Sequence, residues 1–194
     1  MALACLAAEA QHAGEKLARQ GFALIDGTAV PLTAAVAAFD ALRADAEGSQ
    51  RVGPDHPLVR ALLDQPAVRD LAAQALGADA ETVRAIAFDQ ITQLPKSWHQ
   101  PESEITDSAG GCDLILRWHL DLIGPADGGL RVLPGSHLKG PLAAGEIERL
   151  AMETPAMELA VSAGTVLALR PWLVQGSRRR TTRGHRRILQ VQLA

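Results

Sequence analysis

The sequence predicts a single α+β domain whose first part is helical and whose second part is a sandwich or barrel of short strands. The chain has 194 residues, which at roughly 150 residues per domain favours one domain. Apolar residues recur at helical spacing in the first part, whereas the second part holds short apolar runs separated by Gly or Pro. We therefore expect one domain over 1–194, with a mainly helical flank over 1–80 and a β core over 81–194.

The helical flank begins with a clear amphipathic segment. Over 3–19 the apolar positions recur every three or four residues, and Gly21 ends the run. A short strand is expected at 22–25, followed by an Ala-rich helix at 31–46 and a loop that contains Gly48 and Gly53. Two further short helices are expected at 57–64 and 66–76, and Gly77 ends the second of them.

Short runs of aliphatic and β-branched residues predict the strands of the β core. They lie at 83–88, 114–120, 130–133, 157–161, 166–169 and 188–193. One helical segment at 144–151 interrupts this series. Many short strands after a run of helices are typical of an α+β domain with a β sandwich or barrel.

Composition and charge exclude several classes of function. Two distant cysteines, Cys5 and Cys112, exclude a disulfide framework and a zinc ribbon, and no apolar run approaches the roughly 20 residues of a membrane span. We expect a cytoplasmic protein without a membrane partner. The net charge is −3, and the segment 178–187 holds six Arg, so the rest of the chain carries −3 − 6 = −9. This acidic remainder, and the absence of aromatic residues among the arginines, argue against nucleic acid as a partner.

Two of the six histidines stand in strand-like segments beside a tryptophan: His99 follows Trp98, and His119 follows Trp118. Strand alternation places Arg117, His119 and Asp121 on one face, which either faces solvent or lines a pocket. The spacing of His119 and Asp121 would also suit two ligands of a two-His-one-carboxylate iron site. This tripeptide alone is a weak signal.

Three segments together resemble the bacterial phytanoyl-CoA dioxygenase-like family. They are Phe88-Asp89-Gln90 with Trp98-His99-Gln100, the signature GGLRVLPGSH at 128–137, and AGTVLALRPWLVQGS at 163–177 with GHRRILQVQLA at 184–194. The resemblance runs in order over roughly the C-terminal 110 residues. It implies a double-stranded β-helix, the cupin-like jelly roll, with N-terminal flanking helices. Members of this family are usually oxygenases that depend on Fe(II) and 2-oxoglutarate.

The chain differs from this family at positions that the resemblance assigns to binding of the metal and of 2-oxoglutarate. The family's metal-binding Trp-His-Gln-Asp motif is Trp98-His99-Gln100-Pro101 here, and Gln175 stands where the distal His ligand belongs. Gln90 replaces a Lys that can help to hold 2-oxoglutarate, and the insert over 101–111 is short. The resemblance implies that Arg186, or its neighbour Arg187, is the Arg that grips the 2-oxoglutarate carboxylate.

These departures predict that the usual iron site is absent. Loss of one partner around a metal typically costs 10–100-fold in affinity, so loss of two direct ligands should cost about 10²–10⁴-fold. The remaining groups suit proton transfer on an anionic small molecule, such as an isomerisation, cyclisation or elimination. We expect His99 or His119 to be the base and Arg117 or Arg186 to hold the negative charge. Trp98, Gln175 and Arg186 are the expected substrate-binding residues, and we expect no metal and no cofactor.

Two alternatives remain open. One is a hydroxylase that uses Fe(II) and 2-oxoglutarate through a shifted metal site made of His99, His119 and Asp121. The other is a ligand-binding protein without catalysis, which would use the same arginines. The arginine-rich segment 178–187 is either a solvated loop from which only Arg186 points inward, or an electropositive rim for an anionic substrate. A substrate linked to a carrier or to CoA is one form of the second option. We expect a role in bacterial specialised metabolism; the oligomeric state is left open.

Overall fold

Two antiparallel sheets form the body of the molecule. The structure, a computed structural model, describes residues 2–26, 30–43, 49–77, 79–89, 95–101 and 112–194. One sheet has six strands in the order β1-β8-β5-β10-β3-β2, and the other has four in the order β4-β9-β6-β7. The strands of the first sheet, in that order, are Phe22–Ile25, Val166–Leu169, Leu114–His119, Arg187–Leu193, Thr82–Asp89 and Ser49–Val52. Those of the second are Lys96–His99, Gln175–Ser177, Leu130–Val132 and Met157–Glu158.

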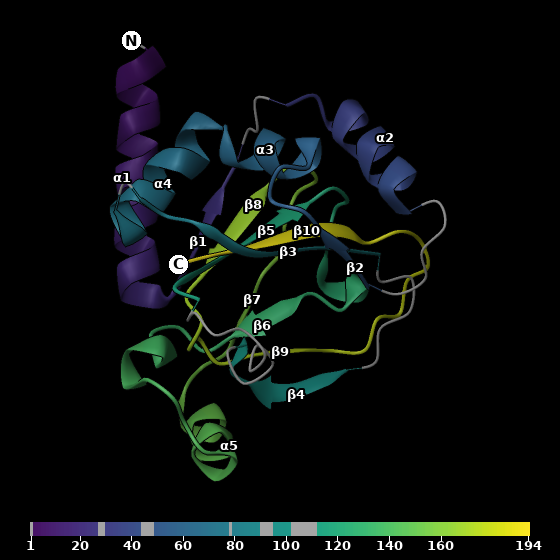
Figure 1. The fold of residues 1–194 in the computed structure, drawn as a ribbon. Helices are drawn as coiled ribbons and strands as arrows, with labels where there is room; N and C mark the ends of the chain where they lie inside the picture. Colours follow the sequence, from purple (N-terminus) through teal and green to yellow (C-terminus); the bar gives the residue numbers. More distant parts are fainter. Residues whose placement is uncertain (1, 27–29, 44–48, 78, 90–94, 102–111) are drawn as a thin grey trace.

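Helices cover the outer face of the six-stranded sheet. They are α1 (Ala2–Gln20), α2 (Leu32–Arg43), α3 (Pro57–Leu63) and α4 (Pro66–Leu76), and the four-stranded sheet lies on the opposite side of the six-stranded one (Figure 1). A fifth helix, α5 (Ala144–Glu153), packs on the outer side of the four-stranded sheet. Among the described helices, none combines the length and the apolar character that crossing a membrane requires. This arrangement confirms the predicted α+β class and the jelly roll with flanking helices.

The predicted elements match the structure at most positions, with a few differences. The strand at 157–161 is shorter, since β7 ends at Glu158 and Val161 forms only an isolated bridge to Ile123. The strands β2 and β9 were not predicted: β2 lies in the expected loop after α2, and β9 has the sequence Gln-Gly-Ser. Neither carries an apolar pattern, and each is held by backbone pairing to a neighbouring strand. The end of the helix expected at 31–46 lies outside the described residues.

The two faces of the six-stranded sheet differ in character, as β5 shows. Leu114, Leu116 and Trp118 belong to the large core under the helices. The alternate residues Ile115, Arg117 and His119 project into the space between the sheets, because successive side chains of a strand point to opposite faces. Ile115 joins an apolar cluster there, whereas Arg117 and His119 form part of a polar region of the barrel interior.

The turn at 135–137 ties the first helix to the strand that carries Gln175. The Ser136 hydroxyl accepts a hydrogen bond from the backbone N–H of Val174 at 2.8 Å, and both residues are buried. The His137 ring donates from Nε2 to the carbonyl of Ala18 at 3.0 Å. His137 also packs on Gly21, where a Cβ would lie 2.6 Å from the His137 Nδ1. The signature at 128–137 thus acts, at its end, as a clamp between α1 and β9.

Candidate active site between the two sheets

His99 and Gln175 are directly opposite each other on β4 and β9. The Nδ1 of His99 lies 2.8 Å from the carbonyl oxygen of Ser97. A carbonyl can only accept, so Nδ1 carries the proton and Nε2 is left as an acceptor. The Gln175 amide nitrogen lies 3.4 Å from this Nε2 and donates to it. Gln175, where the resemblance places the distal ligand, is therefore an amide that contacts His99.

Arg117 continues this network into the six-stranded sheet. Its Nη1 donates to the Gln175 amide oxygen at 3.4 Å, and its Nε donates to the Gln190 amide oxygen at 2.8 Å. A chain of hydrogen bonds thus runs from β10 through β5 and β9 to His99. Sequence reasoning missed Gln190, although the alternation over 188–193 places it on the same face as Arg186.

His119 is buried in the same region without a hydrogen-bond partner. Its side chain belongs to a residue that is only 2% exposed, and neither ring nitrogen has a partner among the described residues. Burial, and then the charges of Arg186 and Arg117, lower the pKa of His119 to about 3, while Asp121 acts weakly in the opposite direction. The imidazole is therefore neutral at pH 7. A buried polar side chain without partners requires an explanation, and a missing ligand is one.

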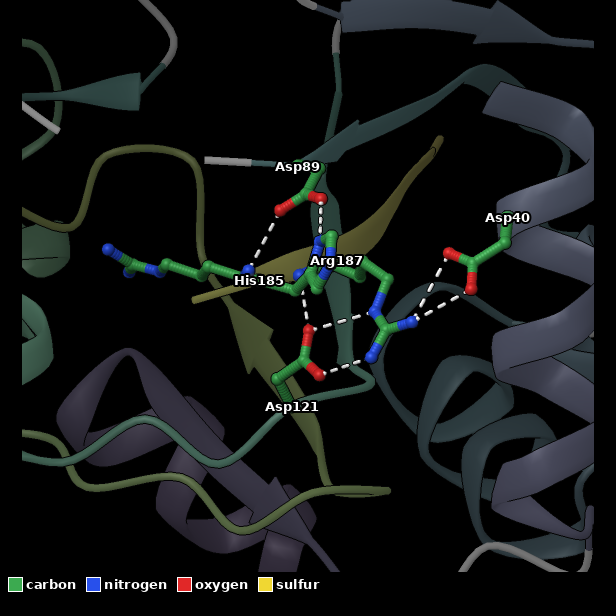
Figure 2. Close-up of polar contacts among 6 residues, drawn as sticks. Asp40, Asp89, Asp121, His185 and Arg187 are labelled. Carbon is green, nitrogen blue, oxygen red and sulfur yellow. Dashed lines mark hydrogen bonds and ion pairs between the residues drawn. The ribbon is translucent and has the colours of Figure 1, made fainter. Parts of the chain in front are cut away.

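Arg186 directly precedes β10, and its side chain points into the space between the sheets. Its Nη1 donates to the Gly128 carbonyl at 3.1 Å, and its backbone N–H donates to Asp89 at 2.8 Å. The other oxygen of Asp89 lies 2.6 Å from Nδ1 of the His185 ring (Figure 2). This carboxylate therefore contacts both the backbone of Arg186 and the side chain of the residue before it. Burial, followed by the charges of Arg117 and Arg180, lowers the pKa of Arg186 to about 10, and the guanidinium stays charged at neutral pH.

The side chain of Arg187 points to the opposite face of the sheet from that of Arg186, toward α2, and so lies apart from His99 and His119. Its guanidinium lies between Asp121 and Asp40 of α2, with nitrogen–oxygen distances of 2.7 Å and 3.0 Å (Figure 2). Asp121 also accepts from the Arg187 backbone N–H at 2.7 Å. Burial raises the pKa of Asp121, but the hydrogen bonds from Arg187 outweigh it, and the net pKa is lowered.

The alternation that grouped Asp121 with Arg117 and His119 does not extend that far. Strand β5 ends at His119, and Asp121 turns toward the helix-covered side, where Arg187 engages it. In the structure Asp121 therefore does not join His99 and His119.

Trp98 lies on the opposite face of β4 from His99. It packs with the cluster of Leu133, Ile147 and Val174 beneath α5. The guanidinium carbon of Arg131 sits 4.7 Å from the centre of its ring, a cation–π contact. The structure thus brings together five of the six expected catalytic and substrate-binding residues and sets Trp98 apart. These five are His99, Arg117, His119, Gln175 and Arg186.

The described side chains do not fit an iron ion held in the manner of two histidines and one carboxylate. His99 Nε2 accepts from Gln175, the Gln175 oxygen accepts from Arg117, and Pro101 carries no ligating atom. Within 2–26, 30–43, 49–77, 79–89, 95–101 and 112–194, no group of three His, Cys, Asp or Glu side chains could hold a metal. Gln90 and most of the shortened insert at 101–111 lie outside the described residues.

Solved structures share this fold. AviO1 from Streptomyces viridochromogenes Tue57 is similar at a TM-score of 0.70 and 21% identity, over 95% of this chain and 94% of that one. SnoK, a non-heme alpha ketoglutarate dependent carbocyclase from nogalamycin biosynthesis, is similar at 0.77 and 20%, over 94% and 83%. EctD from S. alaskensis with bound Fe is similar at 0.75 and 18%, over 93% and 74%.

A family model settles the relationship that the fold suggests. No curated protein matches the sequence. The model of phytanoyl-CoA dioxygenase (PhyH) matches residues 15–188, which is most of the chain and runs from the end of α1 to the start of β10. The family is one of enzymes that normally use Fe(II) and 2-oxoglutarate. The chain belongs to the phytanoyl-CoA dioxygenase family.

Proposed function

We propose that this chain is a cytoplasmic enzyme of bacterial specialised metabolism that has lost the family's usual iron site. It carries out metal-independent, non-oxidative acid/base chemistry on an anionic small molecule, as an isomerisation, cyclisation or elimination. The observation that carries this proposal is His119, buried near two charged arginines with both ring nitrogens unpartnered among the described residues. The contact between His99 and Gln175, where the family holds its metal, supports the same conclusion.

In this proposal Arg117 and Arg186 hold the negative charge of the substrate. Both are charged at neutral pH, and each lies close enough to His119 to lower the pKa of its imidazole. Fixed cations in a buried site stabilise an enolate or carboxylate more strongly than they would in water, because the surrounding dielectric is low. Gln175 orients a carbonyl of the substrate through its amide.

His119 moves the proton. Its neutral ring offers one lone pair, as a base requires. Burial is the first cause of the lowered pKa of His119. A bound anion offsets the second cause, the positive charges of Arg186 and Arg117, so the pKa of His119 rises from about 3 when substrate is present, and the ring becomes a stronger base. His99 is the second candidate base, with Nε2 as its acceptor atom, but that atom already receives a hydrogen bond from Gln175.

Two solved neighbours support a chemistry other than simple hydroxylation. One is a carbocyclase, SnoK, and the other is an epimerase, SnoN, both from nogalamycin biosynthesis and both alpha ketoglutarate dependent. They support ring formation or epimerisation as reactions that this fold can host. The metal independence rests on the residues of this chain alone.

The test is a metal analysis of the purified protein, followed by titration with Fe(II) and 2-oxoglutarate while succinate is measured. We expect less than stoichiometric iron and no succinate. Stoichiometric iron together with succinate formation would overturn the proposal. Once a substrate is identified, the variants His99→Ala and His119→Ala test the base; full activity in both would show that neither histidine carries the proton.

The second candidate function is hydroxylation with Fe(II) and 2-oxoglutarate, which the family membership favours. It would need an unusual ligand set that includes His99, His119 and Asp121. Iron that binds wild type and is lost in both His119→Ala and Asp121→Asn would support it. A non-catalytic ligand-binding role makes a different prediction. Wild type would then bind an anionic ligand without turnover, and His119→Ala would still bind that ligand.

A further inference from the structure

Two residues of β4, Ser97 and Trp98, face the single residue Gly176 of β9. The pairs on either side of them show this, and they are Lys96 with Ser177 and His99 with Gln175. Two residues opposite one form a β-bulge, a feature that bends a strand and can re-aim a side chain beside an active site. The bulge lies on the edge strand of the four-stranded sheet, directly before His99 (Figure 1).

Gly176 makes room for this bulge. It is buried, and a Cβ built on it would lie 3.1 Å from the carbonyl oxygen of Lys96 and 3.4 Å from that of Ser97. The ring of Trp98 is equally near, with its Cε3 at 3.3 Å. Gly176 is not one of the glycines with a positive φ. This position therefore needs glycine for the close approach of β4 and not for an unusual backbone conformation.

Packing on the outer face of the sheet holds the bulge in place. Arg131 of β6 is directly opposite Gly176, and its guanidinium carbon lies 4.7 Å from the centre of the Trp98 ring. Trp98 therefore packs against residues of both β9 and β6. Because successive side chains of a strand point to opposite faces, this outward position of Trp98 directs His99 inward.

The bulge also places a backbone carbonyl beside the ring of His99. The carbonyl oxygen of Ser97 lies 2.8 Å from Nδ1. A carbonyl can only accept, so the proton of the neutral ring stays on Nδ1, and the lone pair of Nε2 faces Gln175. An alanine at 176 would push the backbone of Lys96 away by a few tenths of an ångström, and the adjoining carbonyl of Ser97 would move with it.

We infer that Gly176 is a positioning residue for His99. It admits the bulge that brings the Ser97 carbonyl to Nδ1, and it thereby fixes the tautomer of the ring. Nε2 is then the ring atom that can accept a proton from a substrate. The inference rests on the proposed function only for the role of His99 as a candidate base. It adds the residue that prepares this base and the atom through which the base acts.

The experiment determines the tautomer of His99 by NMR of the full chain with ¹⁵N-labelled histidine. At about pH 9 histidine rings are neutral, and correlation spectra show which ring nitrogen carries the proton. The signal of His99 is identified by its absence in His99→Gln. In wild type we expect the proton on Nδ1. Gly176→Ala should lower the ratio of the Nδ1–H form to the Nε2–H form at least about fivefold, as the loss of one hydrogen bond would.

Two other glycine variants separate this effect from a general loss of stability. A Cβ on Gly77 or on Gly53 would meet no atom of the described residues within 4 Å. Gly77→Ala strains the backbone through its positive φ, whereas Gly53→Ala does not. Both variants should keep the wild-type tautomer ratio of His99, although Gly77→Ala loses stability. Urea unfolding measures that loss in each variant, Gly176→Ala included.

A wild-type ring with its proton on Nε2 would overturn the inference, and so would a folded Gly176→Ala with the wild-type ratio. If Gly176→Ala does not fold, deletion of Ser97 takes its place, because it removes the extra residue and its carbonyl together. An unchanged ratio in that deletion would overturn the inference as well. None of these measurements needs a substrate or a metal. The proposed function, with His119 as the base, therefore stands or fails separately, on the iron and succinate measurements.

Discussion

His99 and Gln175 show how strand pairing decides which side chains of the candidate site meet. They are cross-strand partners, so side chains at these positions meet by the geometry of the sheet whatever their chemistry. Two imidazoles there can share a metal, whereas an imidazole and an amide bond to each other. The Gln175 oxygen then accepts from Arg117, and this links His99 to the six-stranded sheet.

The variant Gln175→His tests this interpretation directly. It should place two imidazoles side by side and raise the affinity for Ni²⁺ or Co²⁺ by at least about tenfold over wild type, since loss of even an outer hydrogen-bond partner of a metal ligand typically costs 10–100-fold. Calorimetry with the metal alone provides the measurement. Gln192→His is the matched control, because Gln192 lies on β10, where it is paired with Ile115 and not with His99, and should gain little. Wild-type affinity equal to that of Gln175→His would show that the chain already holds a metal site.

At the scale of elements, the clamp between α1 and β9 positions the site from outside. Gly21 lies at the junction of α1 and β1 with a φ of +86°, and a Cβ there would lie 2.6 Å from His137 and 2.8 Å from Leu173. Gly21→Ala therefore combines backbone strain with a clash in packed surroundings, and we expect a loss of about 2–4 kcal/mol in unfolding free energy. Urea unfolding measures this loss.

Two other glycines separate the contributions at Gly21. Gly77 has a φ of +99° and a ψ of −176°, a region that essentially only glycine adopts, but nothing lies within 4 Å of a Cβ. Gly77→Ala should therefore show the backbone cost alone, about 1–3 kcal/mol. Gly53 has neither a positive φ nor a neighbour within 4 Å, and Gly53→Ala should be close to neutral or slightly stabilising. Equal effects at Gly21 and Gly77 would mean that the contact with His137 is unimportant.

The ion pairs of Arg187 join α2 to the six-stranded sheet, and their two arms should differ in strength. Asp121 is largely shielded and accepts three hydrogen bonds from Arg187, so Asp121→Asn should cost about 1–3 kcal/mol. The Asp40 side chain is 55% exposed, and Asp40→Asn should cost less than about 1 kcal/mol. Urea unfolding of both variants checks this order. A larger loss at Asp40 would reverse our assignment of the stronger arm.

Much of this element-level architecture could be predicted from sequence because it follows apolar periodicity. The strand at 22–25 and the helices at 57–64 and 66–76 match β1, α3 and α4 within a residue. Strands β2 and β9 could not be found this way, since their residues are polar or small and their hydrogen bonds go to distant partners. Strand alternation predicted the inward side chains of Arg117 and His119, which lie on β5. It failed at Asp121, which lies beyond the end of that strand.

For the whole molecule, the barrel interior divides into an apolar and a polar part. Ile115 lies with an apolar cluster between the sheets, while Arg117, further along the same strand, donates hydrogen bonds to residues of both sheets. His119 is buried beyond it, and neither ring nitrogen has a partner among the described residues. Burying a polar group costs free energy unless the group is hydrogen-bonded, so the ring of His119 carries a cost that a bound anion would reduce. Burial of this ring also makes stability depend on pH.

The sign of this dependence follows from the lowered pKa of His119. In the unfolded chain the ring takes up a proton near pH 6.5, whereas burial first, and then Arg186 and Arg117, keep the folded pKa at about 3. Between these values the unfolded state binds more protons, so unfolding free energy falls as pH falls. The loss for this one group is about 2 kcal/mol from pH 7 to pH 5, at about 1.4 kcal/mol per pH unit below 6.5. His137, whose pKa burial also lowers, adds to it with the same sign.

Urea unfolding at pH 7 and at pH 5 measures this contribution as the difference in unfolding free energy between the two pH values. Wild type should lose stability on acidification, His119→Gln should lose about 2 kcal/mol less, and the exposed control His12→Gln should behave like wild type. The carboxyl of Asp121, with its lowered pKa, acts only at lower pH and does not disturb this window. An anion that binds beside His119 should reduce the pH dependence in wild type and leave His119→Gln unchanged. Equal pH dependence in wild type and His119→Gln would mean that the histidine is not held neutral by burial and by its two arginines.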